Sequence, residues 1–141
     1  MNASIRVFSL SLKFFTQDFA GVPVKPAKVL ILGGGVVLKF NAAQRYCTDG
    51  ISAAIFRKVC AKADVPVQTY CNRADMMGGS TLGNISLTHV SVPSADIGLP
   101  QLAMHSCYET AGCKDVGYMI DALTAFYSST FTAENGNYTL K

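Results

Sequence analysis

The chain has 141 residues, of which 50% are hydrophobic and 15% charged, and a formal net charge of +3. This composition excludes a disordered chain and is typical of one compact domain with buried strands. The lysines and arginines are scattered, which argues against a nucleic-acid partner, and no apolar run reaches the ~20 residues of a membrane helix. Five cysteines without a Cys-x-x-Cys pair argue against a disulfide framework and favour a reducing, cytoplasmic location.

The first half of the chain predicts two strands and a helix. Residues 4–15 alternate loosely between apolar and polar, which is compatible with a strand. In 32–41, three glycines lead into a β-branched apolar strand. Thr48 and Asp49 provide an N-cap for a helix over 50–63. The apolar residues that share one face of this helix are Ile51, Ile55, Val59 and Ala63.

The second half continues the alternation of strands and helices. Residues 65–72 predict a strand, Ser80 can cap a short helix, and 90–100 predict a further strand bounded by prolines. Asp115 can cap the last helix, over 116–129. Its apolar positions at helical spacing are Val116, Met119, Ile120, Leu123 and Phe126. This order predicts an α/β fold with a mainly parallel sheet covered on both faces, in which ligands bind at the carboxyl ends of the strands.

Lys39 is the only charged residue of its apolar strand. Such a lysine must reach water at the end of the sheet or find a carboxylate. Tyr46 follows seven residues later, where its hydroxyl can join the same pocket. The two interpretations are a cationic pocket for an acidic group and an ordinary strand-end lysine whose ammonium extends into solvent.

The segment MMGGSTLG, residues 76–83, contains a second candidate site. Gly79 allows close approach of a ligand to the backbone, and the helix that opens at Ser80 and Thr81 offers free N–H groups to a carboxylate, phosphate or oxyanion. The alternative is a glycine turn followed by an N-cap. The triple glycine at 33–35 completes neither a phosphate loop nor a dinucleotide fingerprint, so a tight turn is the better interpretation.

His105 lies in QLAMHS, beyond the carboxyl end of the strand predicted at 90–100. A histidine at that edge can bind a metal or transfer a proton, and the alternative is a structural histidine. Cys107, two residues later, raises the further alternative of a thiol-dependent hydrolase, although no cysteine-protease signature surrounds it.

Three long runs resemble the carboxyl-terminal part of the aspartyl aminopeptidase family, whose members are cytosolic dinuclear zinc exopeptidases. They are KFNAAQRYCTDGISAAIFRKVC, VPVQTYCNRADMMGGSTLGNIS and ADIGLPQLAMHSCYETAGCKDVGYMIDALTAFY. The resemblance implies a fragment of a three-layer α/β/α catalytic domain, with a non-matching segment at 1–31, the matching part at 32–130 and a polar tail at 131–141 that we expect to fray.

The resemblance also implies roles for individual residues. His105 corresponds to a zinc ligand, and Lys39 and Tyr46 line the substrate pocket, where a lysine suits an acidic N-terminal side chain. Gly79, Ser80 and Thr81 lie against the same cleft as lesser candidates. The complete family enzyme holds two zinc ions, cleaves peptide substrates and forms a homo-oligomer.

The remaining family ligands are not found in this sequence. It has no His-x-Asp pair and no Glu-Glu pair, and one histidine cannot hold a catalytic zinc. We therefore expect an aminopeptidase tail, truncated or following a displaced start, that is inactive alone. The alternative is a non-enzymatic remnant that associates with an intact aminopeptidase or binds metal weakly.

Overall fold

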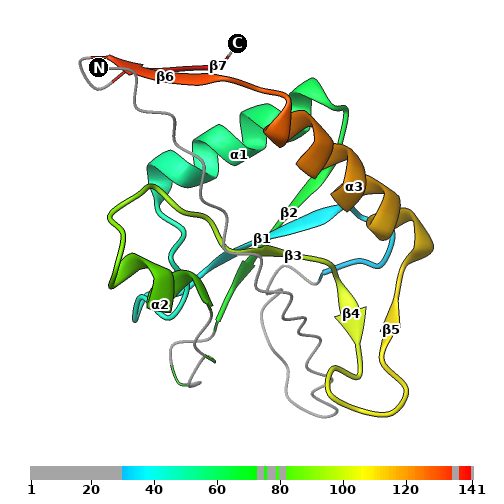
Figure 1. The fold of residues 1–141 in the computed structure, drawn as a ribbon. Coiled ribbons are helices and arrows are strands. Elements are labelled where there is room, and N and C mark those ends of the chain that lie inside the picture. Colours follow the sequence, from blue (N-terminus) through cyan, green and yellow to red (C-terminus); the bar gives the residue numbers. More distant parts are fainter. Residues whose placement is uncertain (1–29, 73–74, 76–78, 80–81, 135–136, 141) are drawn as a thin grey trace.

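The structure is a computed structural model, and it describes residues 30–72, 75, 79, 82–134 and 137–140 (Figure 1). The strand predicted at 4–15 and the cap predicted at Ser80 lie outside these residues. The elements are β1 (Val36–Phe40), α1 (Gly50–Lys62), β2 (Val67–Cys71), α2 (Leu82–Leu87), β3 (Ile97–Gly98), β4 (Gln101–Leu102), β5 (Thr110–Ala111), α3 (Cys113–Tyr127), β6 (Phe131–Glu134) and β7 (Asn137–Leu140).

The central sheet has the order β2-β1-β3 and is mixed. Strands β1 and β2 are parallel, whereas β3 pairs antiparallel with β1, with Leu38 opposite Ile97. The prediction of a mainly parallel sheet is therefore wrong for this part of the chain. The chain enters β3 at Asp96, whose carbonyl accepts a hydrogen bond from the Lys39 N–H at 2.9 Å, at the carboxyl end of β1. From there β3 runs back toward the amino end of β1, so it is antiparallel to β1.

The strand predicted over 90–100 shrinks to the two residues of β3. Pro93 and Pro100 flank it and have no N–H group to donate to a ladder, so pairing cannot extend through them.

The two faces of the sheet differ in what covers them. Helices α1 and α3 lie on one side of the sheet, and the β4–β5 hairpin projects from the other side (Figure 1). The core between the sheet and the two helices includes Val36, Leu38, Ala53, Phe56, Cys60, Ile97, Met119 and Ala122. Because side chains alternate along a strand, Lys39 and Tyr70 point away from this core, toward the side of the hairpin.

Helix α1 begins as predicted. The Asp49 side chain accepts from the Ser52 N–H at 2.7 Å, and the Ser52 hydroxyl accepts from the Asp49 N–H at 3.0 Å, which completes a capping box. The predicted face is confirmed at Val59, which is buried, and at Ala63, which packs against the core, but it is wrong at Ile51, which is 47% exposed. Phe56 and Cys60, four residues apart, face the sheet instead, because turning the large Phe56 ring inward buries more apolar surface.

Asp115 is not the N-cap of α3. The helix begins at Cys113 with Gly112 as its N-cap, and no side chain caps it. The Asp115 carboxylate is 0% exposed and accepts hydrogen bonds from the N–H groups of Gly33 at 2.7 Å and Gly35 at 2.9 Å. Gly33 and Gly35 have φ of 79° and 98°, and such left-handed turns aim successive N–H groups at one anion.

The buried face of α3 matches the prediction in part. Met119 and Phe126 are buried as predicted, whereas Val116 is 45% and Ile120 58% exposed. The difference follows from Asp115, because its burial at the glycine turn rotates the helix so that the next residue faces outward.

The tail predicted to fray forms a hairpin. Strands β6 and β7 pair antiparallel, with Phe131 opposite Leu140. The Phe131 ring lies 5.5 Å from that of Phe126, which anchors the hairpin to the end of α3. The sequence signal for it is Asn135-Gly136, the dipeptide most typical of two-residue hairpin loops.

Candidate functional site

Lys39 is buried on the face of the sheet opposite to α1 and α3. Its side chain is 3% exposed, so the alternative of a strand-end lysine that extends into solvent is wrong. The ammonium Nζ lies 5.7 Å from the centroid of the Tyr46 ring, within the range of a cation–π contact. The predicted pair of Lys39 and Tyr46 therefore meets in space.

The loop between β1 and α1 brings Tyr46 back over the sheet. The Asn41 side chain accepts from the N–H groups of Ala43 at 2.9 Å and Arg45 at 3.3 Å, and Gln44 adopts a left-handed φ of 55°. On the other side, Asn84 of α2 donates to the carbonyl of Arg45 at 2.7 Å. These contacts tighten the loop, so the position of Tyr46 is fixed by backbone geometry.

Tyr46 and Tyr70 lie on the same side of the sheet as Lys39. Tyr70 is the cross-strand partner of Lys39 in the β1–β2 register. Burial raises the pKa of Tyr70 to about 12, and the neighbouring Tyr46 and Cys71 add to the increase. Burial also raises the pKa of Tyr46, followed by the negative charge of Asp96, whereas a hydrogen bond from the Asn72 side chain lowers it. Both phenols are therefore protonated donors at neutral pH.

Asp96 links β3 to the loop that carries Tyr46 through its hydrogen bonds, and the sequence analysis did not single it out. It is 0% exposed, and its Oδ2 accepts from the Cys47 N–H at 2.7 Å. Its own N–H donates to the Thr48 hydroxyl at 2.7 Å. The signal was a lone acidic residue in the apolar stretch SADIG, where a carboxylate is tolerated only when it is hydrogen-bonded.

His105 lies on the loop of the β4–β5 hairpin. It is exposed and adopts a left-handed φ of 67°. Its N–H donates to Glu109 Oε1, and Gln101 donates to Glu109 Oε2 at 2.9 Å, so Glu109 bridges the hairpin. His105 was predicted to follow the sheet edge formed by the carboxyl ends of parallel strands. Because β3 is antiparallel to β1, the chain leaves β3 near the amino end of β1, so this prediction is wrong.

The remaining candidates are partly described. Gly79 is exposed, while Ser80 and Thr81 lie outside the described residues. Cys107 is exposed on the hairpin loop, and no hydrogen bond between it and His105 is recorded in the described part of the chain.

The residues present do not fit a zinc site. Among residues 30–72, 75, 79, 82–134 and 137–140, no group of three or more histidine, cysteine, aspartate or glutamate side chains is placed to hold a metal ion. Glu109 is the acidic residue bonded to the His105 backbone, and its carboxylate is engaged there. A catalytic zinc typically takes three protein ligands, so His105 would need partners from beyond the described residues.

All five cysteines are free thiols. Cys47 and Cys60 are buried, and Cys71, Cys107 and Cys113 are exposed. Burial raises the pKa of Cys60 to about 12, and burial together with the Asp96 carboxylate raises that of Cys47 to about 12. No helix in the described ranges is long and apolar enough to cross a membrane.

Known proteins share both the sequence and the fold. Residues 24–127 match the family described as aminopeptidase I zinc metalloprotease (M18). Two relatives are probable M18 family aminopeptidases 2, from Ectopseudomonas mendocina, 48% identical over 98 residues, and Pseudomonas aeruginosa, 46% identical over 99 residues. Each alignment covers 70% of this chain and 23% of the relative.

Solved structures give the same result. The cryo-EM structure of the Ape4 and Nbr1 complex superposes with a TM-score of 0.77 at 32% identity, over 85% of this chain and 23% of that chain. The S. cerevisiae mApe1 dodecamer superposes with a TM-score of 0.68 at 21% identity, over 85% and 26%, which shows the fold alone.

The mixed sheet and the matched segment define part of a metallo-aminopeptidase domain. The chain belongs to the M18 aminopeptidase family. It spans about a quarter, 23%, of the length of the curated relatives that it matches.

Proposed function

We propose that this chain forms the carboxyl-terminal part of an M18 aminopeptidase site that removes an acidic residue from the amino terminus of a peptide. The observation that carries the proposal is the buried Lys39 ammonium, 3% exposed, beside the Tyr46 ring. A lysine shielded from water is a strong partner for a carboxylate that replaces its lost hydration. Lys39 and Tyr46 therefore bind the acidic side chain of the substrate.

His105 is the residue of this chain that would approach the metal. Zinc in such enzymes lowers the pKa of bound water and polarises the scissile carbonyl. The described residues hold no zinc on their own, so this 141-residue chain is proposed to have no turnover by itself. Gly79, Ser80 and Thr81 are proposed as minor contacts of the substrate backbone. The proposed setting is a cytoplasmic homo-oligomer of the complete enzyme.

The first experiment assays the purified chain with zinc and a chromogenic aspartyl or glutamyl amide. We expect no hydrolysis above background, with and without a metal chelator. Zinc-dependent, chelator-sensitive hydrolysis would contradict the proposal. Activity that survives the chelator but is lost on alkylation would favour the thiol-dependent alternative at Cys107.

The second experiment separates a partial enzyme from a remnant that only binds a partner. The chain is mixed with an intact M18 aminopeptidase, and association is measured by analytical ultracentrifugation. Joint sedimentation without a change of activity favours the non-enzymatic remnant. Independent sedimentation leaves the partial-site proposal as the explanation of the buried Lys39.

A further inference from the structure

Glu109 is an acidic side chain of the β4–β5 hairpin that the proposed function does not use. It stands one position before β5, and each of its two carboxylate oxygens accepts a hydrogen bond. Oε1 accepts from the backbone N–H of His105, and Oε2 accepts from the Gln101 side chain at 2.9 Å. The carboxylate therefore joins the middle of the hairpin loop to the first strand of the hairpin.

Gln101 holds this carboxylate in place. It lies on β4 and is buried, with 7% of its surface exposed, whereas Glu109 and His105 are both exposed. An exposed carboxylate on its own exchanges a protein hydrogen bond for one to water at little cost. Because the buried Gln101 amide binds Oε2, the other oxygen stays within reach of the His105 N–H.

The hairpin loop needs such a contact, because two of its residues adopt a backbone conformation that side chains disfavour. Ala103 has a φ of 51° and His105 a φ of 67°, both in the left-handed region that favours glycine. The Ser106 N–H closes the turn between them by donating to the Ala103 carbonyl at 3.0 Å. Residues with a side chain remain in this region only where the surrounding structure holds them there. At His105, the Glu109 carboxylate supplies that hold.

We propose that Glu109 is a positioning residue for His105. Its carboxylate holds the His105 backbone in the left-handed conformation, and the backbone conformation sets the direction in which the imidazole leaves the loop. The inference rests on the proposed function, since it takes His105 to be the residue that approaches the metal. The role depends on an oxygen at the right reach and not on the charge, so a glutamine at position 109 can also fulfil it.

The test measures amide hydrogen exchange by NMR in the 141-residue chain and its variants. The reporter is the Ser106 N–H, whose hydrogen bond closes the turn. We expect Glu109→Ala to accelerate its exchange about fivefold, as for the loss of one hydrogen bond, and Glu109→Gln to remain within about twofold of the native rate. When His105→Gly is present, Glu109→Ala should have no further effect, because glycine adopts a positive φ without the carboxylate.

The control is Glu134→Ala, which makes the same substitution at an exposed position of β6 and should leave the Ser106 exchange rate unchanged. The inference is overturned if Glu109→Gln accelerates exchange as much as Glu109→Ala, or if Glu109→Ala has the same effect with and without His105→Gly. It is also overturned if the native Ser106 N–H exchanges as fast as in an unstructured peptide. The measurement involves neither metal nor substrate, so each of these results leaves the proposed function intact. Zinc-dependent hydrolysis by the chain alone would contradict the proposed function without changing the exchange rates.

Discussion

The carboxylate of Asp115 on α3 accepts a hydrogen bond from the N–H of Gly35, at 2.9 Å and across 80 positions of the chain. Its second oxygen accepts from Gly33 at 2.7 Å. One buried side chain thus satisfies two N–H groups of the turn that opens β1, and it joins the first described strand to the last helix. Since β1 carries Lys39, this contact also sets the position of the candidate site.

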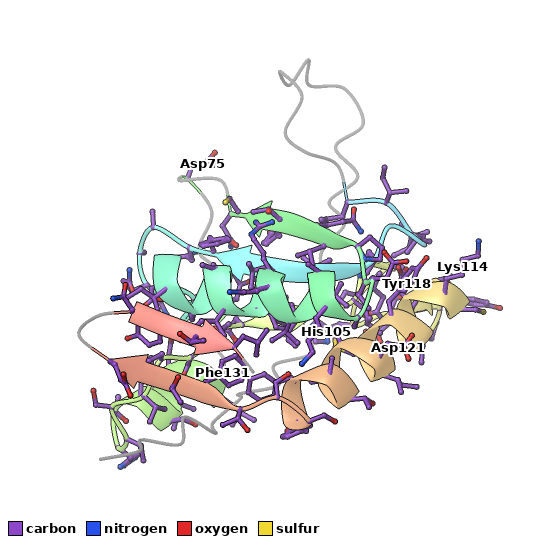
Figure 2. All side chains as sticks on the ribbon, turned by 90° about the horizontal axis from the view of Figure 1, so that it is seen from above. Asp75, His105, Lys114, Tyr118, Asp121 and Phe131 are labelled. Atoms are coloured by element: carbon purple, nitrogen blue, oxygen red, sulfur yellow. The ribbon has the colours of Figure 1, made fainter. Side chains whose placement is uncertain are left out.

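Replacing Asp115 should destabilise the domain more than any surface change on α3. Asp115→Ala leaves two buried N–H groups without an acceptor and is expected to lower the free energy of unfolding by about 3 kcal/mol. Asp115→Asn keeps one acceptor oxygen and should cost less. The control is Asp121→Ala, an exposed position of the same helix (Figure 2), for which a change within about 0.5 kcal/mol is expected. Urea unfolding followed by circular dichroism measures all three, and equal losses would refute the role of Asp115.

Two glycines should respond oppositely to alanine. Gly35 has a φ of 98°, and an added Cβ would lie 2.0 Å from the Pro66 carbonyl oxygen, so Gly35→Ala should cost about 3 kcal/mol or prevent folding. Gly117, inside α3, has nothing within 4 Å of an added Cβ. Gly117→Ala should raise stability by about 0.5–1 kcal/mol through helix propensity. Thermal unfolding of the two variants is the measurement, and a stabilised Gly35→Ala variant would contradict the turn geometry.

Stability should fall at alkaline pH. Burial raises the pKa of Cys60 from 9.0 to about 12 in the folded chain. Above pH 9 this thiol therefore binds fewer protons in the unfolded chain than in the folded one, so its contribution to the free energy of unfolding is constant below pH 9 and decreases between pH 9 and 12. Cys60→Ala should show a shallower decrease over this range. An identical pH profile for the variant would show that Cys60 does not contribute.

Lys39 and His105 should separate specificity from chemistry when the chain is joined to the upstream part of a close M18 relative. Lys39→Ala should reduce kcat/KM for an acidic amino-terminal residue by about 2–5 kcal/mol of transition-state free energy, and much less for a neutral residue. His105→Ala should abolish both activities, since it removes a predicted ligand of the metal that serves every substrate. Equal losses on both substrates for Lys39→Ala would mean that the lysine is structural.

The isolated chain should self-associate. Strand β2 pairs only with β1 among the described residues, which leaves a sheet edge open, and α3 exposes Val116, Ile120 and Tyr127 along one stripe. Light scattering should show a mass that rises with concentration. Ile120→Lys should reduce the association, whereas Asp121→Lys, at the next position, should not. A sharp monomer at all concentrations would contradict the prediction.

The sequence by itself determined the local elements. The strands at β1 and β2, the helices α1 and α3 and the Asp49 cap were predictable, because β-branched runs, helical spacing and a side chain that caps its own helix act within a few residues. The pairing of Lys39 with Tyr46 was also accessible, since Tyr46 follows Lys39 by seven positions, on a short loop that returns to the strand.

Only the tertiary structure decided the contacts between distant segments. Asp115 had local N–H groups to cap but is bonded to glycines about 80 positions away, because the two converging N–H groups of a buried turn are the stronger hydrogen-bond donors to its carboxylate. The direction of β3, and with it the place of His105 relative to Lys39, depends on where the chain re-enters the sheet. The inward face of α1 was decided by which side chain, Phe56 rather than Ile51, fits against the sheet. Each of these outcomes depends on which of several alternative packings has the lowest free energy. The residues that contact one another in these packings lie far apart in the chain, so no short stretch of sequence contains both.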